Sequence, residues 1–398
     1  MSDPYRTYCE KRKAEHQFRQ LRETQPLADG RVQRDGETLL NFASNDYLGL
    51  SRHPLLVERS RAFAEQFGAG STASRLISGN LPAYAVIEEK LARGKHCETS
   101  LLLASGYQAN VTVLAALADA EALGQPVTIL ADRLSHNSLL QGAMLSGARF
   151  MRFRHNDYEH LETLLKQQAE KNACAIIVSE SVFGMDGDCA DITALTALAQ
   201  RFEAVLYIDE AHATGVFGPD GFGFCAEHKG RIDIAMGTFG KALGSFGAYI
   251  GCRQVVRDYL IQNCGGFVYS TALPPPVLGA IDAALELLPS LQNERAHLLT
   301  QAARLRQVLQ QQGWNIGAST THIVPVILGG EQAATSLADI LRTNGIFAPA
   351  IRPPTVPRGT SRLRFSLSAA HKIGDIDHLI SIMQEQAAQF AAPSAIAS

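Results

Sequence analysis

Short apolar runs alternate with amphipathic segments over the first two thirds of the chain. The apolar runs are continuous and do not alternate in polarity, which is typical of strands buried on both faces of a parallel sheet. The segments between them repeat apolar residues at helical spacing. This order predicts an α/β domain with helices on both faces of a mainly parallel sheet. The predicted strands lie in TSLLLASG, PVTILAD, CAIIVSES, AVLYIDEAHATG, IAMGTFGK and GAYIGC.

Helices, a strand and a loop are predicted before the first of these strands. Residues 5–25 have a helical pattern, and residues 38–50 predict a short strand that runs into a turn. Apolar residues recur at helical spacing in two further segments, which end at Gly68 and Gly94. The Gly/Ser-rich stretch GAGSTASRLISGN between these two helices predicts a loop.

The last third of the chain has a different pattern. A long helix begins near STALPPPVLGAIDAALELL, where prolines suit the first turn. Helix, strand and helix then follow, with HIVPVILGG and SRLRFSLSA as strands. We therefore predict an N-terminal arm and the start of a small domain over residues 1–50, a large α/β domain over 51–285, and a smaller C-terminal α+β domain over 286–398.

Composition and charge narrow the classes of function. The chain has 398 residues, of which 46% are hydrophobic and 19% are charged, values ordinary for a globular enzyme. A formal net charge of -3 argues against a general nucleic-acid or membrane-surface binder. One basic run, Lys11 to Arg22, has acidic and apolar interruptions. A solvated helix face is the favoured interpretation of this run, and a polyanion-binding patch is the alternative.

The cysteines and the apolar segments of the chain indicate the cellular compartment of the protein. The seven cysteines are odd in number and include no C-x-x-C pair, which favours free thiols in a reducing compartment. The first 16 residues lack the apolar core of a signal peptide, and no run is long and apolar enough to span a bilayer. No H-E-x-x-H or comparable metal constellation occurs. We expect a cytoplasmic protein without a metal site.

The residues that follow the predicted strands are the candidates for chemistry, because ligands of open parallel sheets bind past the carboxyl ends of the strands. Together these residues provide a Gly-led turn into a helix, an acid, two imidazoles and an amine. A Gly-led turn can hold a phosphate, although many such turns have no ligand. The candidate segments are Ser105 to Tyr107, Asp132 to His136, Glu180 to Gly187, Asp209 to His212 and Thr238 to Lys241.

Two motifs suggest nucleotide chemistry but lack its context. The letters DEAH also occur in helicases, which need a phosphate loop G-x-x-x-x-G-K-[ST]; here Ala242 follows Lys241, so the hydroxyl is absent. The stretch FGAGSTA contains G-x-G-x-x-A but follows a helical segment, so the dinucleotide-binding context fails.

Three side chains have a structural interpretation beside a functional one. Asp209 ends an apolar strand and needs a partner or a cation, such as a pyridinium nitrogen; a hydrogen-bonded structural role is the alternative. His136 starts a helix, where a structural histidine is common. Lys241 lies among small residues in TFGKALG, where desolvation would favour a nucleophilic amine; the alternative is a lysine that reaches out of an apolar strand. In combination these groups suit pyridoxal 5'-phosphate (PLP).

These motifs resemble those of a known enzyme family. The stretches NDYLGL, SRLISGN, ASGYQAN, DRLSHNSLL, FGMDGD, DEAHATGVFG, TFGKALG, YST and IRPPTVPRGTSRLRFSLSAAH occur in the order found in the α-oxoamine synthases, over residues 38–371. That resemblance implies the aspartate aminotransferase-like fold (PLP fold type I), PLP as cofactor and a homodimer with the cofactor site at the subunit interface. It also implies condensation of an amino acid with an acyl thioester of coenzyme A or a carrier protein. Members that use alanine, glycine or serine share the core, so the amino acid stays open.

The resemblance also implies roles for single residues around the cofactor. Lys241 matches the lysine that binds PLP covalently and removes the Cα proton, and Asp209 matches the carboxylate at the pyridine nitrogen. His212 matches the imidazole at the phenolic oxygen. His136 matches the ring stacked on the pyridine, beside the substrate. Residues of the phosphate cradle are matched by Gly106, Tyr107 and Thr238, and those that reach the phosphate of the partner subunit by Ser270 and Thr271.

The resemblance also implies substrate-binding positions, and the chain departs from the family pattern at one residue. Arg352 matches the arginine that holds the amino-acid carboxylate, a role that suits its bidentate fork. Asn45, Arg19 and Thr355 match positions near the amino acid or the acyl group. The family usually has a serine where this chain has Gly184, and that serine contacts the phenolic oxygen of PLP. Loss of such a hydrogen bond costs about 1 kcal/mol, which would weaken cofactor binding without abolishing the chemistry.

Overall fold

The computed structural model describes residues 3–14 and 18–391 of the chain. Two compact units are present, one of Asn45–Leu298 and one of Met1–Ser44 with Leu299–Ser398. The domain limits predicted after residues 50 and 285 stay predictions. No helix of the described part is long and apolar enough to cross a membrane.

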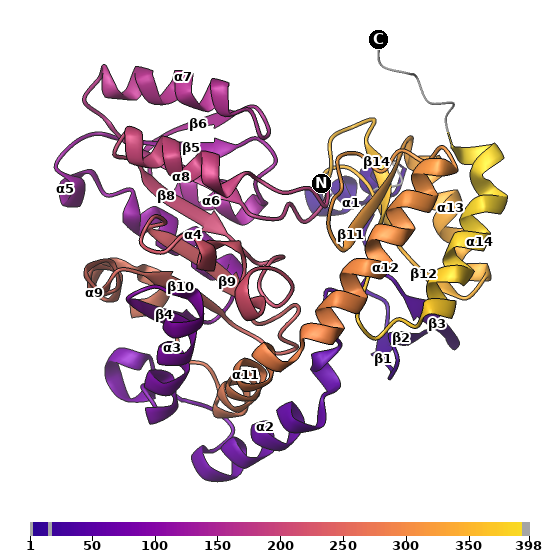
Figure 1. The fold of residues 1–398 in the computed structure, drawn as a ribbon, viewed down its shortest axis with the longest axis horizontal. Coiled ribbons are helices and arrows are strands. Elements are labelled where there is room, and N and C mark those ends of the chain that lie inside the picture. Colours follow the sequence, from indigo (N-terminus) through magenta and orange to yellow (C-terminus); the bar gives the residue numbers. More distant parts are fainter. Residues whose placement is uncertain (1–2, 15–17, 392–398) are drawn as a thin grey trace. The chain divides into compact units, whose positions relative to one another are not determined.

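A seven-stranded sheet forms the centre of the Asn45–Leu298 unit (Figure 1). Its strand order is β4-β10-β9-β8-β7-β5-β6, and every pairing from β9 to β6 is parallel. Only β10 runs antiparallel to both of its neighbours. The predicted mainly parallel sheet is confirmed. The strands are β4 (Thr99–Leu103), β5 (Val127–Asp132), β6 (Arg149–Phe153), β7 (Cys174–Glu180), β8 (Val205–Asp209), β9 (Ile234–Thr238) and β10 (Ala248–Cys252).

Helices cover both faces of this sheet, as the continuous apolar strands predict. Side chains of α4 (Gly106–Leu117), α6 (Asn137–Leu145) and α9 (Gln254–Asn263) pack on one face. Side chains of α7 (Tyr158–Ala169) and α8 (Ile192–Arg201) pack on the other face. The remaining helices of the unit are α2 (Pro54–Phe67), α3 (Pro82–Lys95), α5 (Ala120–Leu123), α10 (Gly265–Val268) and α11 (Pro275–Leu287).

The other unit combines two small sheets with helices. One sheet has the order β1-β2-β3-β12 and the other the order β11-β14-β13. The strands are β1 (Thr24–Pro26), β2 (Arg31–Arg34), β3 (Glu37–Asn41), β11 (Ile323–Gly329), β12 (Ile346–Phe347), β13 (Ala350–Ile351) and β14 (Ser361–Ser366). The helices are α1 (Pro4–Ala14), α13 (Glu331–Thr343) and α14 (Ile373–Phe390), and α12 (Gln292–Gln311) leads in from the Asn45–Leu298 unit. The predicted strands HIVPVILGG and SRLRFSLSA are confirmed.

Three local predictions were wrong. The helix predicted over residues 5–25 is α1, which ends at Ala14 and buries no residue, and Thr24–Pro26 pairs with β2 instead. Without a buried face, tertiary packing does not extend a helix. The helix α3 continues through Gly94 to Lys95, and its C-cap residue His96 has a left-handed backbone conformation. Gly94 allows close packing instead of ending the helix, since a Cβ there would lie 2.3 Å from the Phe222 ring. The predicted Gly/Ser loop contains a π-helical turn over Arg75–Gly79.

An ion pair lies completely buried beneath the carboxyl end of β8. Lys95 at the end of α3 contacts Glu210, and neither side chain has any exposed surface. Glu210 also accepts a hydrogen bond from the backbone N–H of Cys225. Burial alone would lower the pKa of Lys95, but the charge of Glu210, the smaller contributions of Tyr249 and Cys225, and the hydrogen bond to Glu210 together outweigh burial, so the pKa lies above its ordinary value. Lys95 is therefore a cation, and Glu210 is its ion-pair partner.

We predict that Lys95→Met lowers the free energy of unfolding by about 3–5 kcal/mol, because it leaves the Glu210 carboxylate buried without a cation. Arg93→Met is the matched control on the same helix, since Arg93 pairs with Glu89 at the surface. Its expected loss is at most about 1 kcal/mol. Chemical denaturation of the two variants measures the difference, and equal losses would contradict the prediction.

Candidate active site

A cavity of about 200 Å³ lies at the carboxyl ends of β8 and β9, beside the first turns of α4 and α6. Seven of the residues predicted for the site line it: Gly106, Tyr107, His136, Asp209, His212, Thr238 and Lys241. The strand-end positions named from the sequence therefore converge in space. The other lining residues are Asn110, Ser138, Glu180, Ala211 and Met236.

Lys241 is half-buried and contacts an imidazole. Its Nζ lies 2.8 Å from Nε2 of His212, and Nδ1 of the same ring lies 2.6 Å from the hydroxyl of Tyr47. The Tyr47 hydroxyl donates to Oδ1 of Asn45 at 2.9 Å. Because a hydroxyl has one hydrogen, His212 Nδ1–H is the donor to Tyr47, and in the neutral ring Nε2 is the acceptor for Lys241. The contacts thus aim the basic nitrogen of His212 at the amine.

Asp209, the last residue of β8, presents a buried carboxylate that is 3% exposed. Oδ1 accepts from the backbone N–H of Ala211 at 2.8 Å, and Oδ2 accepts from Asn110 Nδ2 at 2.7 Å. The Asn110 side chain is oriented in turn, because its Oδ1 accepts from Tyr207. A buried carboxylate held only by neutral donors is suited to bind a cationic nitrogen.

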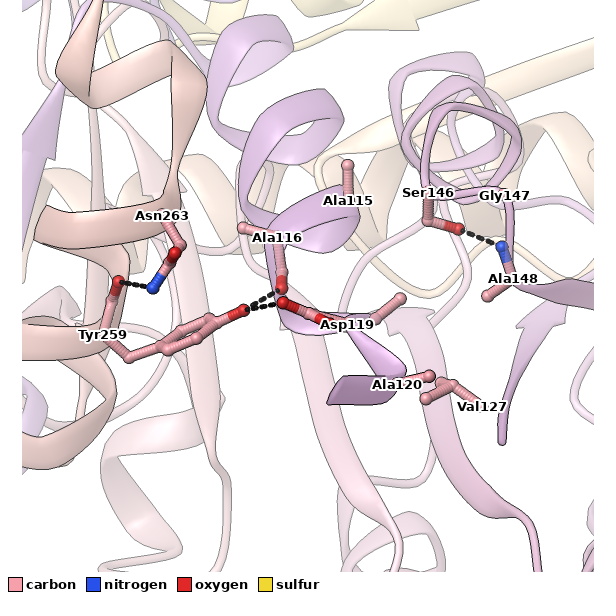
Figure 2. Close-up of a pocket in the computed structure, with 11 residues that line it drawn as sticks. Ala115, Ala116, Asp119, Ala120, Val127, Ser146, Gly147, Ala148, Tyr259 and Asn263 are labelled. Carbon is pink, nitrogen blue, oxygen red and sulfur yellow. Dashed lines mark hydrogen bonds between the residues drawn. The ribbon is translucent and has the colours of Figure 1, made fainter. Parts of the chain in front are cut away.

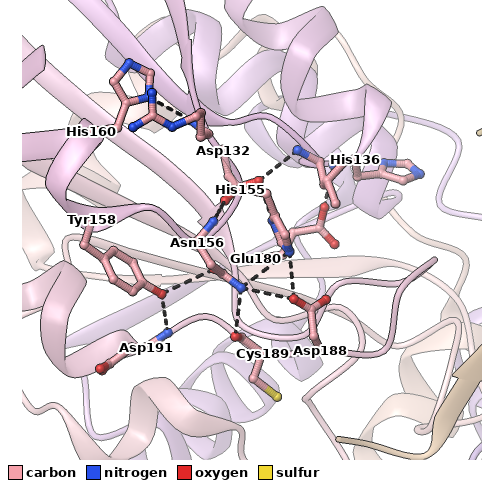
Figure 3. A network of polar contacts seen from close by, with 12 residues as sticks. Asp132, His136, His155, Asn156, Tyr158, His160, Glu180, Asp188, Cys189 and Asp191 are labelled. Carbon is pink, nitrogen blue, oxygen red and sulfur yellow. Dashed lines mark hydrogen bonds and ion pairs between the residues drawn. The ribbon is translucent and has the colours of Figure 1, made fainter. Parts of the chain in front are cut away.

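His136 caps the first turn of α6. Its Nδ1 accepts from the backbone N–H of Ser138 at 3.3 Å, and its own backbone N–H donates to Glu180 (Figure 3). Although the residue is accessible to solvent, desolvation by the surrounding protein lowers the pKa of His136. The charge of Asp209 opposes this shift, and the charge of Lys241 adds to it. A neutral ring is therefore favoured at neutral pH. Burial raises the pKa of Glu180 well above its ordinary value, with Asp209 adding to the effect.

The first turn of α4 provides backbone donors at the cavity. Ser105 caps the helix by accepting from Gln108 N–H at 3.1 Å, and the first backbone bond is donated by Ala109 to Ser105. Gly106 and Tyr107 precede that bond, so their N–H groups are free of the helix ladder. Thr238 lies beside them: a Cβ on Gly106 would be 3.7 Å from the Thr238 Cβ. This is a helix N-terminus open to an anion.

The remaining predicted residues lie outside this cavity. Ser270 accepts from Gln108 Nε2 at 3.0 Å, and it lines a separate small pocket with Thr271. Arg19, Arg352 and Thr355 belong to the other compact unit. There Arg19 Nη2 donates to Thr355 Oγ1 at 3.1 Å, and the Thr355 N–H donates to the Arg352 carbonyl, so these three predicted positions are neighbours in that unit.

Three residues that organise the site had no predicted role. Asn110 lies one helical turn beyond Gly106 in ASGYQAN, and Tyr47 lies two residues beyond Asn45 in NDYLGL. Glu180 ends the strand β7. All three lie in segments that the sequence singled out, but their partners come from distant parts of the chain. No spacing in the sequence could show that Asn110 contacts Asp209, or that Tyr47 contacts His212.

A larger cavity of about 430 Å³ is lined by few side chains that could take part in a reaction (Figure 2). Small residues make up most of its wall, including Ala115, Ala116 and Gly147. Its phenol, Tyr259, already donates to the carbonyl of Ala116 at 2.7 Å and lies 3.3 Å from Asp119. No group of three metal-ligating side chains occurs in the described ranges either. The cavity that contains Lys241 is therefore the candidate active site.

Gly184 is packed against the ring of His212. A Cβ at Gly184 would lie 2.3 Å from His212 Nε2, the nitrogen that contacts Lys241. The imidazole thus occupies the space that a side chain at residue 184 would need.

We predict that Gly184→Ala lowers turnover by about tenfold, because the added Cβ displaces the His212 ring, and overpacking of this kind costs about 1–3 kcal/mol. Gly184→Ser adds a hydroxyl to the same Cβ and is expected to retain PLP more tightly than Gly184→Ala. Turnover and the PLP dissociation constant of both variants provide the measurement. Unchanged turnover in both variants would show that the ring position is unimportant.

The comparisons with known proteins agree with this geometry. The model of the aminotransferase class I and II family matches residues 37–383, and the chain belongs to this family. Relatives of this chain confirm the predicted resemblance to α-oxoamine synthases. The 8-amino-7-oxononanoate synthase of Gluconacetobacter diazotrophicus is 52% identical over 89% of this chain and 90% of that protein. A Magnetococcus marinus protein, provisionally named for the same activity, is 53% identical over 93% of this chain and 94% of its own.

A solved structure has the same fold. Serine palmitoyltransferase with PLP superposes with a TM-score of 0.88 at 26% identity, and the match covers 96% of each chain. The predicted aspartate aminotransferase-like fold, with a large mainly parallel sheet, is confirmed.

Proposed function

We propose that this chain is a PLP-dependent acyltransferase that condenses L-alanine with a pimeloyl thioester and releases carbon dioxide. The product is 8-amino-7-oxononanoate, a precursor in biotin biosynthesis, and the acyl carrier is coenzyme A or a carrier protein. The observation that carries the proposal is the meeting of Lys241 Nζ, the Asp209 carboxylate and the α4 N-terminus in one cavity. Relatives at 52–53% identity that have this name support it.

The residues of the cavity fit PLP. PLP presents an aldehyde, a basic pyridine nitrogen and a phosphate, and the cavity offers an amine, a carboxylate and a helix N-terminus. Lys241 would hold the aldehyde carbon covalently, Asp209 the protonated nitrogen, and Gly106, Tyr107 and Thr238 the phosphate. When bound, PLP withdraws electrons from the amino-acid Cα and so acidifies its proton.

The protein's own groups then handle protons and orientation. Lys241 Nζ removes the Cα proton of L-alanine and later returns a proton to the product. His212 contacts Lys241 through Nε2 at 2.8 Å and helps keep the amine oriented towards that proton. The carboxylate of Asp209 would hold a proton at the ring nitrogen when the cofactor is bound, and the resulting positive charge would stabilise negative charge that develops there. His136 would lie with its neutral ring against the pyridine, beside the substrate.

The substrate contacts and the assembly are also proposed. Arg352 holds the carboxylate of L-alanine, and Asn45, Arg19 and Thr355 lie near the amino acid or the acyl group. Arg19 and Thr355 are hydrogen-bonded to each other, which supports a shared role. We propose a cytoplasmic homodimer in which Ser270 and Thr271 reach the phosphate bound by the partner subunit. The exposure of the adjacent Tyr269 side chain, 89%, supports an interface at this segment.

The visible absorption spectrum of the PLP-loaded protein tests the amino-acid preference. L-Alanine, glycine and L-serine are titrated separately, and we expect L-alanine to change the cofactor band at the lowest concentration. A stronger response to glycine would instead favour a 2-amino-3-ketobutyrate ligase activity on the same fold. If the protein forms no cofactor band with PLP, the proposed function is wrong.

A further inference from the structure

An imidazole lies between two carboxylates behind the candidate active site (Figure 3). Nδ1 of His155 lies 2.9 Å from Asp132 Oδ1, and Nε2 lies 2.7 Å from Asp188 Oδ2. Both aspartates are buried, with 0% and 6% of their surface exposed. Because both ring nitrogens face carboxylate oxygens, each of them must carry a hydrogen. The Asp132–His155–Asp188 triad therefore contains an imidazolium.

The two carboxylates belong to the loops that shape the cavity. Asp132 ends β5 and begins the turn to His136, and it accepts from the backbone N–H of Leu134 at 2.8 Å. Asp188 closes the loop after β7: its carbonyl accepts from Phe183 N–H, and that loop includes Gly184, which packs against His212. His155 itself follows the edge strand β6. One side chain thus joins the loop of His136 to the loop that supports His212.

Charge explains why the contacts of His155 with Asp132 and Asp188 are strong. Among the described residues, Asp132 and Asp188 are the charged groups that contact the ring; its other neighbours are Asn156 and the Phe183 ring, which are neutral. Asp188 Oδ2 also accepts a hydrogen bond from Asn156 Nδ2, at 3.1 Å. Burial acts to lower the pKa of His155, but the hydrogen bonds to Asp132 and Asp188 outweigh it and raise the pKa to about 10. The cation persists across the physiological pH range.

We propose that His155 is a positioning residue: its imidazolium holds the two loops together and thereby fixes His136 and His212 around the cofactor. No direct contact with PLP or substrate is involved. This role in cofactor binding rests on the proposed function, whereas the charge clamp itself does not. Without the cation, two buried carboxylates would face each other, and the loops would separate.

The test compares His155→Gln with His160→Gln. His160 lies in the first turn of α7 and accepts from the backbone N–H of Arg154, so it is a nearby histidine outside the triad. We expect His155→Gln to weaken PLP binding by the apoprotein at least about fivefold, within the range for residues coupled in one network, and His160→Gln to leave it unchanged. The visible band of bound PLP should also shift in His155→Gln alone, because His136 and His212 would contact the ring under the proposed function.

The double variant His155→Gln/Asp188→Asn separates positioning from general damage to the fold. It removes the facing negative charge, so it should bind PLP more tightly than His155→Gln and serve as the test protein if the single variant fails to fold. If His155→Gln and His160→Gln bind PLP alike with the same band, or if Asp188→Asn gives no recovery, positioning is ruled out.

The pH dependence of stability tests the clamp independently of PLP. The folded pKa of about 10 lies above the unfolded value of 6.5, so the stabilisation by His155 is complete below pH 6.5 and is lost as the pH rises towards 10. The difference in apoprotein stability between the unaltered chain and His155→Gln should therefore be largest near pH 6 and shrink towards pH 10. A difference that is constant with pH would overturn the charge clamp. If the stability difference changes with pH as expected but the unaltered chain binds no PLP, the charge clamp is supported and the proposed function is wrong.

Discussion

Lys241→Ala is expected to abolish product formation, with a loss of about 10⁴-fold or more, because one side chain both binds the cofactor covalently and transfers the Cα proton. Lys241 is the amine that lines the cavity, and its Nζ is held by His212 Nε2 at 2.8 Å. Among the residues that the structure describes, no other lysine lines that cavity. Product formation is measured by mass spectrometry, and covalent attachment by borohydride reduction followed by the mass of the intact protein.

A matched control is Lys229→Ala, since Lys229 is an exposed lysine of the same unit. We expect the control to retain full turnover and to keep PLP attached after reduction. The Lys241→Ala protein should fold and bind PLP only reversibly. Turnover in Lys241→Ala within tenfold of the control would contradict the proposed role of the amine.

Asp209→Asn is expected to lower kcat by about 10²- to 10³-fold, the range for removal of one preorganised electrostatic contact. The substitution keeps the shape of the side chain but removes the charge that would hold the ring nitrogen protonated. Asn110 and the Ala211 N–H donate to the carboxylate, so the asparagine must leave one of these donors unpaired or rotate its amide. Steady-state kinetics with L-alanine measure the loss.

Asp258→Asn provides the control for Asp209→Asn, because Asp258 is exposed and accepts a hydrogen bond from Gln254 on the same helix. The control should leave kcat unchanged. A loss of kcat smaller than about tenfold in Asp209→Asn would contradict the role of the carboxylate.

Sequence patterns could identify the central sheet because its strands are buried on both faces. Six of its seven strands are continuous apolar runs, and all six were predicted. The seventh strand, β6, has the sequence RFMRF, lies at the edge of the sheet and exposes both arginines. Its apolar run is interrupted by charge, so this segment does not have the pattern of a strand buried on both faces. His155, which follows this strand, was missed for the same reason.

The candidate site could be predicted as far as residue type and strand position determine it. Lys241, Asp209, His212 and His136 each follow a strand, and their convergence follows from the parallel order of the sheet. The contacts that orient them could not be predicted, because Tyr47 and His212 are 165 residues apart, and Asn110 and Asp209 are 99 apart. Gly184 shows the same limit: the family resemblance implies a serine at this position, and only the structure shows that the His212 ring fills the space that a side chain there would need.

The most direct test of the central claim is the product formed from pimeloyl-coenzyme A. The PLP-loaded protein is incubated with pimeloyl-coenzyme A and an equimolar mixture of L-alanine, glycine and L-serine, and the products are identified by mass. The account predicts 8-amino-7-oxononanoate as the main product, together with free coenzyme A and carbon dioxide in equal amounts. If the glycine or serine adduct predominates, or if no thioester is consumed with coenzyme A or carrier-protein thioesters, the account is contradicted.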